Sequence, residues 1–261
     1  MDIIVCIKQV PGSTDIKIDP ATNTLIRDSA DAVINPFDAH AVEAGVALKE
    51  QYGGSVKVLS MGPPQASEAI KQAISVGVDE GFLISDKEFA GADTLATSYT
   101  LSAAIRKMAS YDLIICGKQT LDGDTGQVGP EMANHLGIPC ATFIRKIVEV
   151  KDGFMKAERL IEEGYEVVEF PLPAVISVVK ELNEPRLPSI RGLMAAKKAE
   201  VPVWTAQDIE ADKERIGLSG SPTWVVKTFT PVREKNNVIF EGEPEKQVSD
   251  LVARLRDEGI V

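Results

Sequence analysis

The chain has 261 residues, 44% of them hydrophobic and 26% charged, with a formal net charge of −11 and an isoelectric point of about 4.8. A protein that binds nucleic-acid phosphates needs a basic face, so this acidic balance argues against nucleic acid as a partner and against anionic membrane surfaces. No apolar run approaches the ~18–20 residues of a membrane span, and no basic leader precedes the first apolar run, which predicts a cytoplasmic protein. The three cysteines are scattered and lack the spacing of metal ligands, so no metal site is expected.

Apolar runs alternate with helical patterns through the first half of the chain. The runs at residues 3–7, 56–60, 81–85 and 113–116 show no polar alternation, which is typical of strands buried on both faces of a parallel sheet. Helices are expected to begin near Asn35, Pro63, Asp93 and Asp124, and the last to end at Gly137. This succession predicts the α/β class, with a three-layer, doubly wound, Rossmann-like parallel sheet.

Three of these helices are expected to start with side-chain caps, and Asp93 is expected to cap the helix that follows it. Asn35 occupies a typical N-cap position, Pro36 suits the first helical position, and Asp38 resembles a capping-box acid. Asp124 with Gln127 can cap the helix that ends at Gly137 in the same way.

The pattern changes in the second half of the chain. The pair Asp152–Gly153 is typical of a hairpin turn between two strands, at residues 141–151 and 154–160. Two further strands are expected at residues 166–170 and 174–179, so the sheet should gain antiparallel strands. Residues 201–238 are expected to form an extended arm, followed by a helix at residues 244–258. The predicted division is an α/β domain with an antiparallel extension at 1–182, a loop at 183–200, and an arm at 201–261 that packs on a partner.

Small residues gather where three of the predicted strands end. In open α/β sheets, ligands bind at the carboxyl ends of the strands, where the strand order reverses. Glycines at 117, 123, 126 and 129 run from the end of one strand to the start of a helix. They allow backbone N–H groups to approach a phosphate, and Thr125 and Gln127 add donors. This predicts a nucleotide site.

Other interpretations of the same residues stay open. A glycine-rich turn can lack a ligand, Asp122 and Asp124 can act only as caps, and neither a dinucleotide fingerprint nor a P-loop is present. Cys6 and Cys116 are interpreted as small core residues. No catalytic set of nucleophile, base and orienting residue is visible, which is typical of a protein whose chemistry is carried by a cofactor.

Several motifs, taken together, resemble one family over nearly the whole chain. They are Val5-Cys6-Ile7-Lys8-Gln9-Val10, Asn35-Pro36-Phe37-Asp38, Ser60-Met61-Gly62-Pro63, Gly117-Lys118-Gln119, Asp122-Gly123-Asp124, Pro171-Leu172-Pro173-Ala174-Val175 and Leu182-Asn183-Glu184-Pro185-Arg186. The sequence resembles the beta subunit of electron-transferring flavoprotein. The resemblance implies a heterodimer with an alpha subunit that carries a redox-active FAD, while this chain holds a second nucleotide.

The nucleotide pocket is expected at positions where the strand-end analysis and the resemblance agree. These positions are Cys6, Asn35, Pro36, Phe37, Asp38, Ser60, Met61, Gly62, Gly117, Lys118, Gln119, Thr120, Leu121, Asp122, Gly123, Asp124, Thr125, Gly126, Gln127 and Val128.

The identity of the nucleotide follows from the branch of the family that the chain resembles. Residues 122–130 resemble the electron-bifurcating branch, which implies FAD in this chain and NADH as its reductant. It also implies two electron routes. One leads to the alpha-subunit FAD and on to an acyl-CoA or related flavin dehydrogenase, and the other leads to ferredoxin or flavodoxin. The alternative is a non-bifurcating carrier with structural AMP. A third possibility is a nucleotide-binding regulatory protein of similar fold.

Residues 185–198 resemble the loop by which this subunit recognises a partner dehydrogenase. Ile190, Leu193 and Met194 would form its aliphatic patch, and a basic rim would come from Arg186, Arg191, Lys197 and Lys198. Ala195 stands where the family often has lysine, so the partner preference does not carry over directly. The alternative is a loop folded onto its own domain.

Overall fold

The computed structural model describes residues 1–12, 18–19, 24–25, 32–108, 110–226 and 237–261. Two compact units are present, Met1–Trp224 and Val225–Val261, and each is described by itself.

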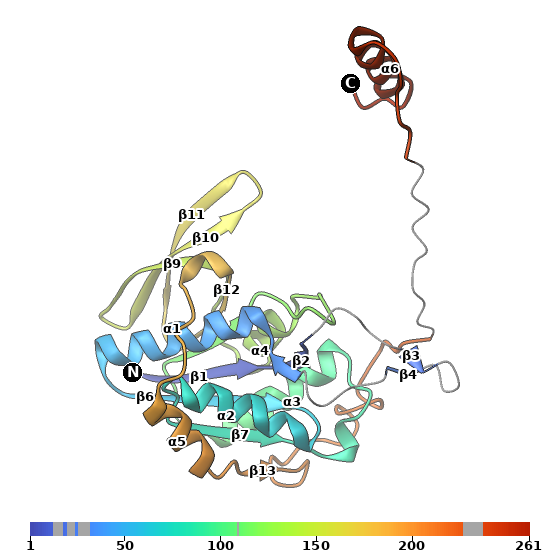
Figure 1. The fold of residues 1–261 in the computed structure, drawn as a ribbon. Coiled ribbons are helices and arrows are strands. Elements are labelled where there is room, and N and C mark those ends of the chain that lie inside the picture. The colour runs from blue at the N-terminus through green and yellow to red at the C-terminus, as the bar shows by residue number, and fades with distance from the viewer. Residues whose placement is uncertain (13–17, 20–23, 26–31, 109, 227–236) are drawn as a thin grey trace. The chain divides into compact units, whose positions relative to one another are not determined.

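The first unit is built on a nine-stranded sheet, in which β1 and its parallel neighbours lie at the centre (Figure 1). In spatial order its strands are β11 (Gly164–Pro171), β10 (Phe154–Ile161), β9 (Cys140–Lys151), β12 (Ala174–Val178), β8 (Leu113–Gly117), β1 (Asp2–Ile7), β6 (Ser55–Met61), β7 (Glu80–Ile84) and β13 (Val203–Trp204). Short pairs are formed by β2 (Gln9–Pro11) with β5 (Ala32–Ile34) and by β3 (Ile18–Asp19) with β4 (Thr24–Leu25).

Helices follow the parallel strands in the expected alternation. They are α1 (Pro36–Tyr52), α2 (Ser67–Ser75), α3 (Thr94–Lys107), α4 (Val128–Leu136) and α5 (Ile190–Lys198), with short 3₁₀ turns η2 (Pro64–Ala66), η3 (Lys87–Phe89) and η4 (Lys180–Leu182). The side chain of Asp93 caps α3 by accepting from the Ala96 amide, as predicted.

Each central strand contributes to two hydrophobic cores, because successive side chains point to opposite faces. In β1, Ile3 and Val5 pack with α1 and α2, whereas Ile4 and Cys6 pack with α3 and α4. Burial on both faces explains why these strands are continuous apolar runs. The predicted three-layer, doubly wound α/β fold is confirmed.

The second half confirms one part of the prediction and corrects another. β9, β10 and β11 are antiparallel, and the β9–β10 turn falls at Asp152 and Gly153 with positive φ values of 52° and 79°. The expectation that residues 174–179 add an antiparallel strand is wrong, because β12 lies parallel between β8 and β9. β12 is buried along its whole length, so it is a central strand, and its continuous apolar run is typical of that position.

Residues 203–224 also differ from the expected extended arm. β13 pairs with β7 as a parallel edge strand, and Ala206, Ile209 and Ile216 are buried in the core beside α3. These few apolar side chains show no periodicity because they fill gaps in an existing core. Residues 227–236 of the predicted arm lie outside the described residues.

The second unit contains α6 (Pro244–Asp257), which confirms the predicted terminal helix. Pro244 occupies its first position, where a missing N–H is tolerated. None of the residues of α6 is buried. Among the described parts of the chain, no helix combines the length and apolar character that crossing a bilayer requires.

Candidate functional site

The candidate site lies where the strand order reverses. From β1 the chain continues through α1 to β6 on one side, while β8 lies on the other side of β1. β1 and β8 are parallel, with Cys6 opposite Cys116, so their carboxyl ends lie at the same edge. This is the topological switch point at which open α/β sheets bind ligands.

Asp38 ties these two strand ends together. Its Oδ2 accepts a hydrogen bond from the Lys8 backbone N–H at 2.7 Å, and its Oδ1 accepts from the Gly117 N–H at 3.1 Å. The expectation that Asp38 acts as a capping-box acid is therefore wrong. The carboxylate serves two amides outside its own helix, so it holds β1 and β8 against the start of α1.

Asn35 holds the loop that follows β8. Its Nδ2 donates to the Gln119 carbonyl at 2.8 Å, and its Oδ1 accepts from the Leu121 N–H at 3.2 Å. Asn35 precedes α1 as predicted, but its side chain makes no cap hydrogen bond. The prediction of a side-chain N-cap is wrong because this fully buried amide is used across the crevice instead.

Gly117 permits this close assembly. A Cβ at this position would collide with Asp38 Oδ1 and lie 2.7 Å from the Phe37 carbonyl carbon. Only glycine lets the end of β8 reach the first turn of α1. The Pro36–Phe37–Asp38 turn is thereby brought against the strand end, as the predicted pocket requires.

The loop from Gln119 to Gln127 is the open part of the site. Leu121, Asp122, Gly123, Asp124 and Thr125 are all exposed. Asp122 forms an ion pair with Lys8 at 2.7 Å, which links the loop to the residue after β1. Thr120 closes the turn by accepting from the Gly123 N–H through its hydroxyl at 3.3 Å.

The loop leads directly into the N-terminus of α4. Gly126 has a φ of +65°, which L side chains rarely adopt. The prediction that Asp124 and Gln127 cap α4 is wrong: Gln127 precedes Val128 without a side-chain cap bond, and Asp124 instead accepts from the Gln119 amide. Free N–H groups at a helix start and the exposed hydroxyl of Thr125 suit an anionic group such as a phosphate.

Burial shifts the titration of the ionisable groups in the crevice toward their neutral forms. Burial raises the pKa of the Asp38 carboxyl to about 7, against the opposing hydrogen bonds from Lys8 and Gly117. Burial and the Asp38 charge raise the pKa of the Cys6 thiol to about 12. Burial also raises the pKa of Cys116. Both thiols are buried core residues, as predicted, and neither is a poised nucleophile.

The end of β6 contributes a further polar group. Ser60 is fully buried, and within the described residues its hydroxyl has no hydrogen-bond partner. Met61 is half-buried and Gly62 donates its N–H to the Ile84 carbonyl, so these two residues continue the edge of the sheet. An unpartnered buried hydroxyl beside the switch point is consistent with a polar ligand there.

The structure adds a pocket that the sequence analysis missed. It has a volume of about 380 Å³ and is lined by Lys118, Phe143, Arg159, Leu160, Ile161, Glu162 and Val179. Lys118 Nζ lies 5.5 Å from the centroid of the Phe143 ring, and Phe143 has a φ of +59°. Strained backbone at a bulky residue is typical of functional sites. Of these residues, only Lys118 carried a sequence signal.

The predicted partner loop is in fact a helix. α5 begins after Ser189, whose hydroxyl accepts from the Gly192 N–H, and it buries Ala196. Ile190, Leu193 and Met194 are 82%, 52% and 59% exposed. The inner face is formed by small residues, so its periodicity was not visible in the sequence. Arg186 is not part of a basic rim, because it pairs with Glu43 and Glu50 of α1.

Comparisons with known proteins agree with this architecture. The family profile described as "Electron transfer flavoprotein domain" matches residues 22–209, which is more than half of the chain. "Electron transfer flavoprotein subunit beta" of Thermoanaerobacterium thermosaccharolyticum is 47% identical and is covered in full, as is this chain. The protein of the same name from Clostridium acetobutylicum is 45% identical, with 99% of each chain covered. "Caffeyl-CoA reductase-Etf complex subunit CarD" of Acetobacterium woodii is 41% identical over the whole of both chains.

The matches to these relatives extend over the ends of β1 and β8, the loop after β8 and α5, and two of the relatives are covered over their full length. The chain belongs to the electron transfer flavoprotein family, as a beta subunit.

Proposed function

We propose that this chain is the beta subunit of an electron-bifurcating flavoprotein that holds FAD at the crevice between β1 and β8. The observation that carries the proposal is the open loop from Gln119 to Gln127, which is fixed by Asn35 and leads into the N-terminus of α4. Its backbone would cradle the pyrophosphate, with Thr125 and Gly126 at the point of closest approach. The kinship with CarD, a subunit of a reductase complex, supports the same assignment.

The residues present fit a dinucleotide. A dinucleotide needs a phosphate cradle and a second ring site, and the pocket beside Lys118 offers apolar walls and cations for that ring. Arg159 lines this pocket, and its buried Nε has no hydrogen-bond partner among the described residues. When bound, the flavin supplies the hydride acceptance and one-electron transfer that side chains cannot perform. The chain would position the flavin, and burial keeps the neighbouring thiols of Cys6 and Cys116 protonated.

NADH is the proposed source of the hydride, and the electrons leave by two routes. One route leads to the FAD of an alpha subunit and then to an acyl-CoA or related flavin dehydrogenase, and the other to ferredoxin or flavodoxin. The exposed aliphatic residues of α5 are the proposed docking site for the dehydrogenase. α6, with an exposed apolar stripe, is proposed to pack on the alpha subunit.

Nucleotide content tests the cofactor directly. The heterodimer with its alpha subunit would be purified, denatured, and its released nucleotides quantified beside an absorption spectrum. About two flavins per heterodimer, with reduction of both by NADH, would support the proposal. About one flavin and one AMP would show that the crevice holds a structural mononucleotide, and that the chain acts as a structural and docking subunit of a simple electron carrier.

A further inference from the structure

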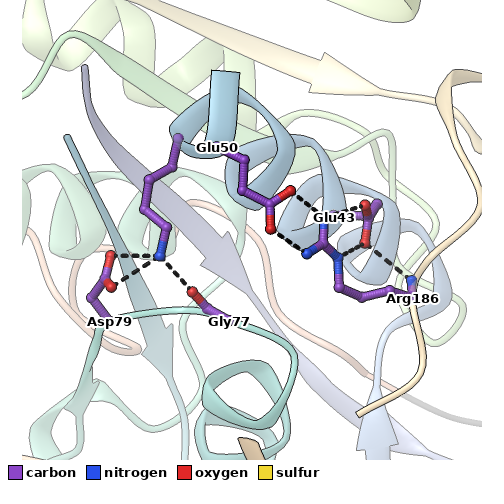
Figure 2. Close-up of polar contacts among 6 residues, drawn as sticks. Glu43, Glu50, Gly77, Asp79 and Arg186 are labelled. Atoms are coloured by element: carbon purple, nitrogen blue, oxygen red, sulfur yellow. Dashed lines mark hydrogen bonds and ion pairs between the residues drawn. The ribbon is translucent and has the colours of Figure 1, made fainter. Parts of the chain in front are cut away.

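A single arginine fastens the segment before α5 to helix α1. Arg186 Nε and Nη2 donate to the two carboxylate oxygens of Glu43 at 2.9 and 3.0 Å, and its backbone N–H donates to Glu43 at 3.0 Å. Arg186 Nη1 and Nη2 also donate to the two oxygens of Glu50 at 2.6 and 2.9 Å. Figure 2 shows both carboxylates, which lie about two turns apart on α1, directed at the one guanidinium.

The two carboxylates differ in their surroundings. The side chain of Glu43 is 12% exposed, that of Arg186 is 34% exposed, and that of Glu50 is 56% exposed. Hydrogen bonds to Glu50 and Glu43 hold the pKa of Arg186 above its ordinary value. The inner pair is shielded from water and also fixes the backbone, so it contributes more to position than an exposed surface pair does.

The neighbouring residues extend this fixation in both directions. Asn183 donates through Nδ2 to the His40 carbonyl at 3.0 Å, so it binds the same helix one turn earlier. Pro188 restricts φ two residues before α5 begins. A Cβ on Gly192 would collide with the Ser75 carbonyl oxygen, so α5 lies tightly against the end of α2.

This packing decides which side chains α5 presents. Gly192 and Ala196, one helical turn apart, are directed at the inner face, and Ala196 is buried. Ile190, Leu193 and Met194 follow the i, i+3, i+4 spacing of the opposite stripe and are exposed. The orientation of the aliphatic stripe therefore depends on the packing of α5 against α2 and on the segment that leads the chain into α5.

We propose that Arg186 is a positioning residue for partner docking: it fixes the approach of the chain to α5 through Glu43 and Glu50, so that Ile190 and Leu193 are presented before the dehydrogenase arrives. This inference rests on the proposed function, because it needs α5 to be the docking helix. A pre-positioned helix binds more tightly because less conformational freedom is lost on association.

Lysine could not replace this arginine. The guanidinium uses four N–H bonds to two carboxylates, whereas an ammonium is a point charge without a planar fork. Loss of the arginine would leave Glu43, which is largely buried, without its charged partner. Release of the segment relieves that penalty, so we expect local detachment rather than loss of the fold.

Hydrogen exchange of the heterodimer tests the anchoring without a dehydrogenase. Arg186→Gln and Arg186→Lys should both raise amide exchange in residues 189–198 and leave α3 unchanged. Lys49→Gln is the matched control, because Lys49 is a cation on α1 that binds the Gly77 carbonyl at 2.7 Å and Asp79 at 2.9 Å and not the segment before α5 (Figure 2). Unchanged exchange in α5, or an equal rise in every helix, would overturn the proposal.

Docking kinetics test the consequence. With a purified short-chain acyl-CoA dehydrogenase titrated, Arg186→Gln should raise the KM for the dehydrogenase about tenfold, because only about a tenth of the molecules would present α5 correctly. The kcat and the NADH half-reaction should stay within about twofold of wild type. An unchanged KM beside increased α5 exchange would overturn the docking role of Arg186. If Ile190→Ala also leaves the KM unchanged, the proposed docking function fails, while the anchoring of α5 stands.

Discussion

Asp38 shows how much one buried carboxylate can organise. It joins the residue after β1, the last residue of β8 and the start of α1 through two backbone amides. Asn35, one turn earlier, reaches across to the loop after β8. Both residues are predicted as site residues, because the sequence places them at the start of the helix that follows the first strand. Their partners could not be predicted, because a capping pattern and a cross-crevice hydrogen bond use the same residue types.

The first prediction concerns the pH dependence of stability. Burial raises the pKa of Asp38 from an ordinary 3.8 to about 7. Between these values the folded chain keeps a proton that the unfolded chain releases, so stability falls as pH rises from about 4 to 7 and is level above that range. The full effect is on the order of 4 kcal/mol. Asp38→Asn should abolish this contribution.

Urea unfolding at pH 4.5 to 7 measures the slope of the free energy of unfolding against pH. Asp122→Asn is the control, since Asp122, despite partial burial, has its pKa lowered by Lys8 and is ionised throughout this range. Its replacement should leave the slope unchanged. A slope that persists in Asp38→Asn would show that another group is responsible.

The second prediction concerns the phosphate cradle. Gly126 and Gly137 both have left-handed φ values, +65° and +68°, but a Cβ on Gly126 would lie 3.3 Å from the Lys118 carbonyl oxygen and one on Gly137 would meet nothing within 4 Å. Valine at either position should cost about 1–2 kcal/mol of backbone strain. Only Gly126→Val should also lower nucleotide occupancy.

The measurement is nucleotide content beside thermal unfolding for both variants. Full occupancy in Gly126→Val would show that the phosphates bind elsewhere. Equal loss of nucleotide in Gly137→Val would mean that occupancy follows stability alone.

Among the elements, predictability follows how each one is buried. The central strands were predicted because burial on both faces requires continuous apolar runs. The direction of β12 could not be predicted, because a parallel strand inside the sheet and an antiparallel strand added to it need the same apolar residues. α5 was missed because its inner face consists of small residues, Gly192 and Ala196, which carry little hydrophobic signal. The pocket beside Lys118 depends on the bend at Phe143, which no sequence pattern encodes.

The third prediction concerns α5 itself. Ile190→Ala and Leu193→Ala should each raise the KM for the partner dehydrogenase about tenfold, equivalent to about 1.4 kcal/mol, because a few apolar anchors dominate such interfaces. Leu95→Ala is a suitable control, since Leu95 is an exposed leucine on α3, which packs against the other core. Arg191→Gln should act more weakly, and its effect should shrink at high salt.

Steady-state assays with the dehydrogenase titrated, beside an NADH half-reaction without it, separate docking from cofactor chemistry. Reduction by NADH should be unchanged in both alanine variants. A parallel fall in both assays would place α5 in the cofactor site or in the fold rather than at a docking surface.

At the scale of the molecule, the chain consists of one unit with a complete core and one without. Among the residues that the structure describes, the last buried apolar side chain is Ile216, and no residue of α6 is buried. A chain segment that buries little apolar surface does not recover the entropy lost on ordering. The predicted dependence of the C-terminal region on a partner therefore applies to the unit that begins at Val225, whereas residues 203–224 belong to the first unit.

The fourth prediction follows from this division. A chain that ends at Trp224 should keep the thermal unfolding midpoint of the first unit within a few degrees, since each kcal/mol corresponds to about 2–4 °C at this size. Its affinity for the alpha subunit should fall by at least about tenfold, because the exposed stripe of α6 is lost. Calorimetry and analytical gel filtration with the alpha subunit measure the two effects. Unchanged affinity would assign assembly to the first unit alone.

The segment that carries α5 is secured at both ends within the first unit. Asn183 and Arg186 hold it on one side, and β13 holds it on the other. The side chains that face outward take no part in either attachment. On the proposed docking function, exchange of only the exposed residues Ile190, Leu193 and Met194 between relatives should therefore alter partner choice without disturbing cofactor or core. On the proposed function, the exposed face of α5 would be the part of the chain that changes with the partner dehydrogenase, while the attachments of the segment stay the same.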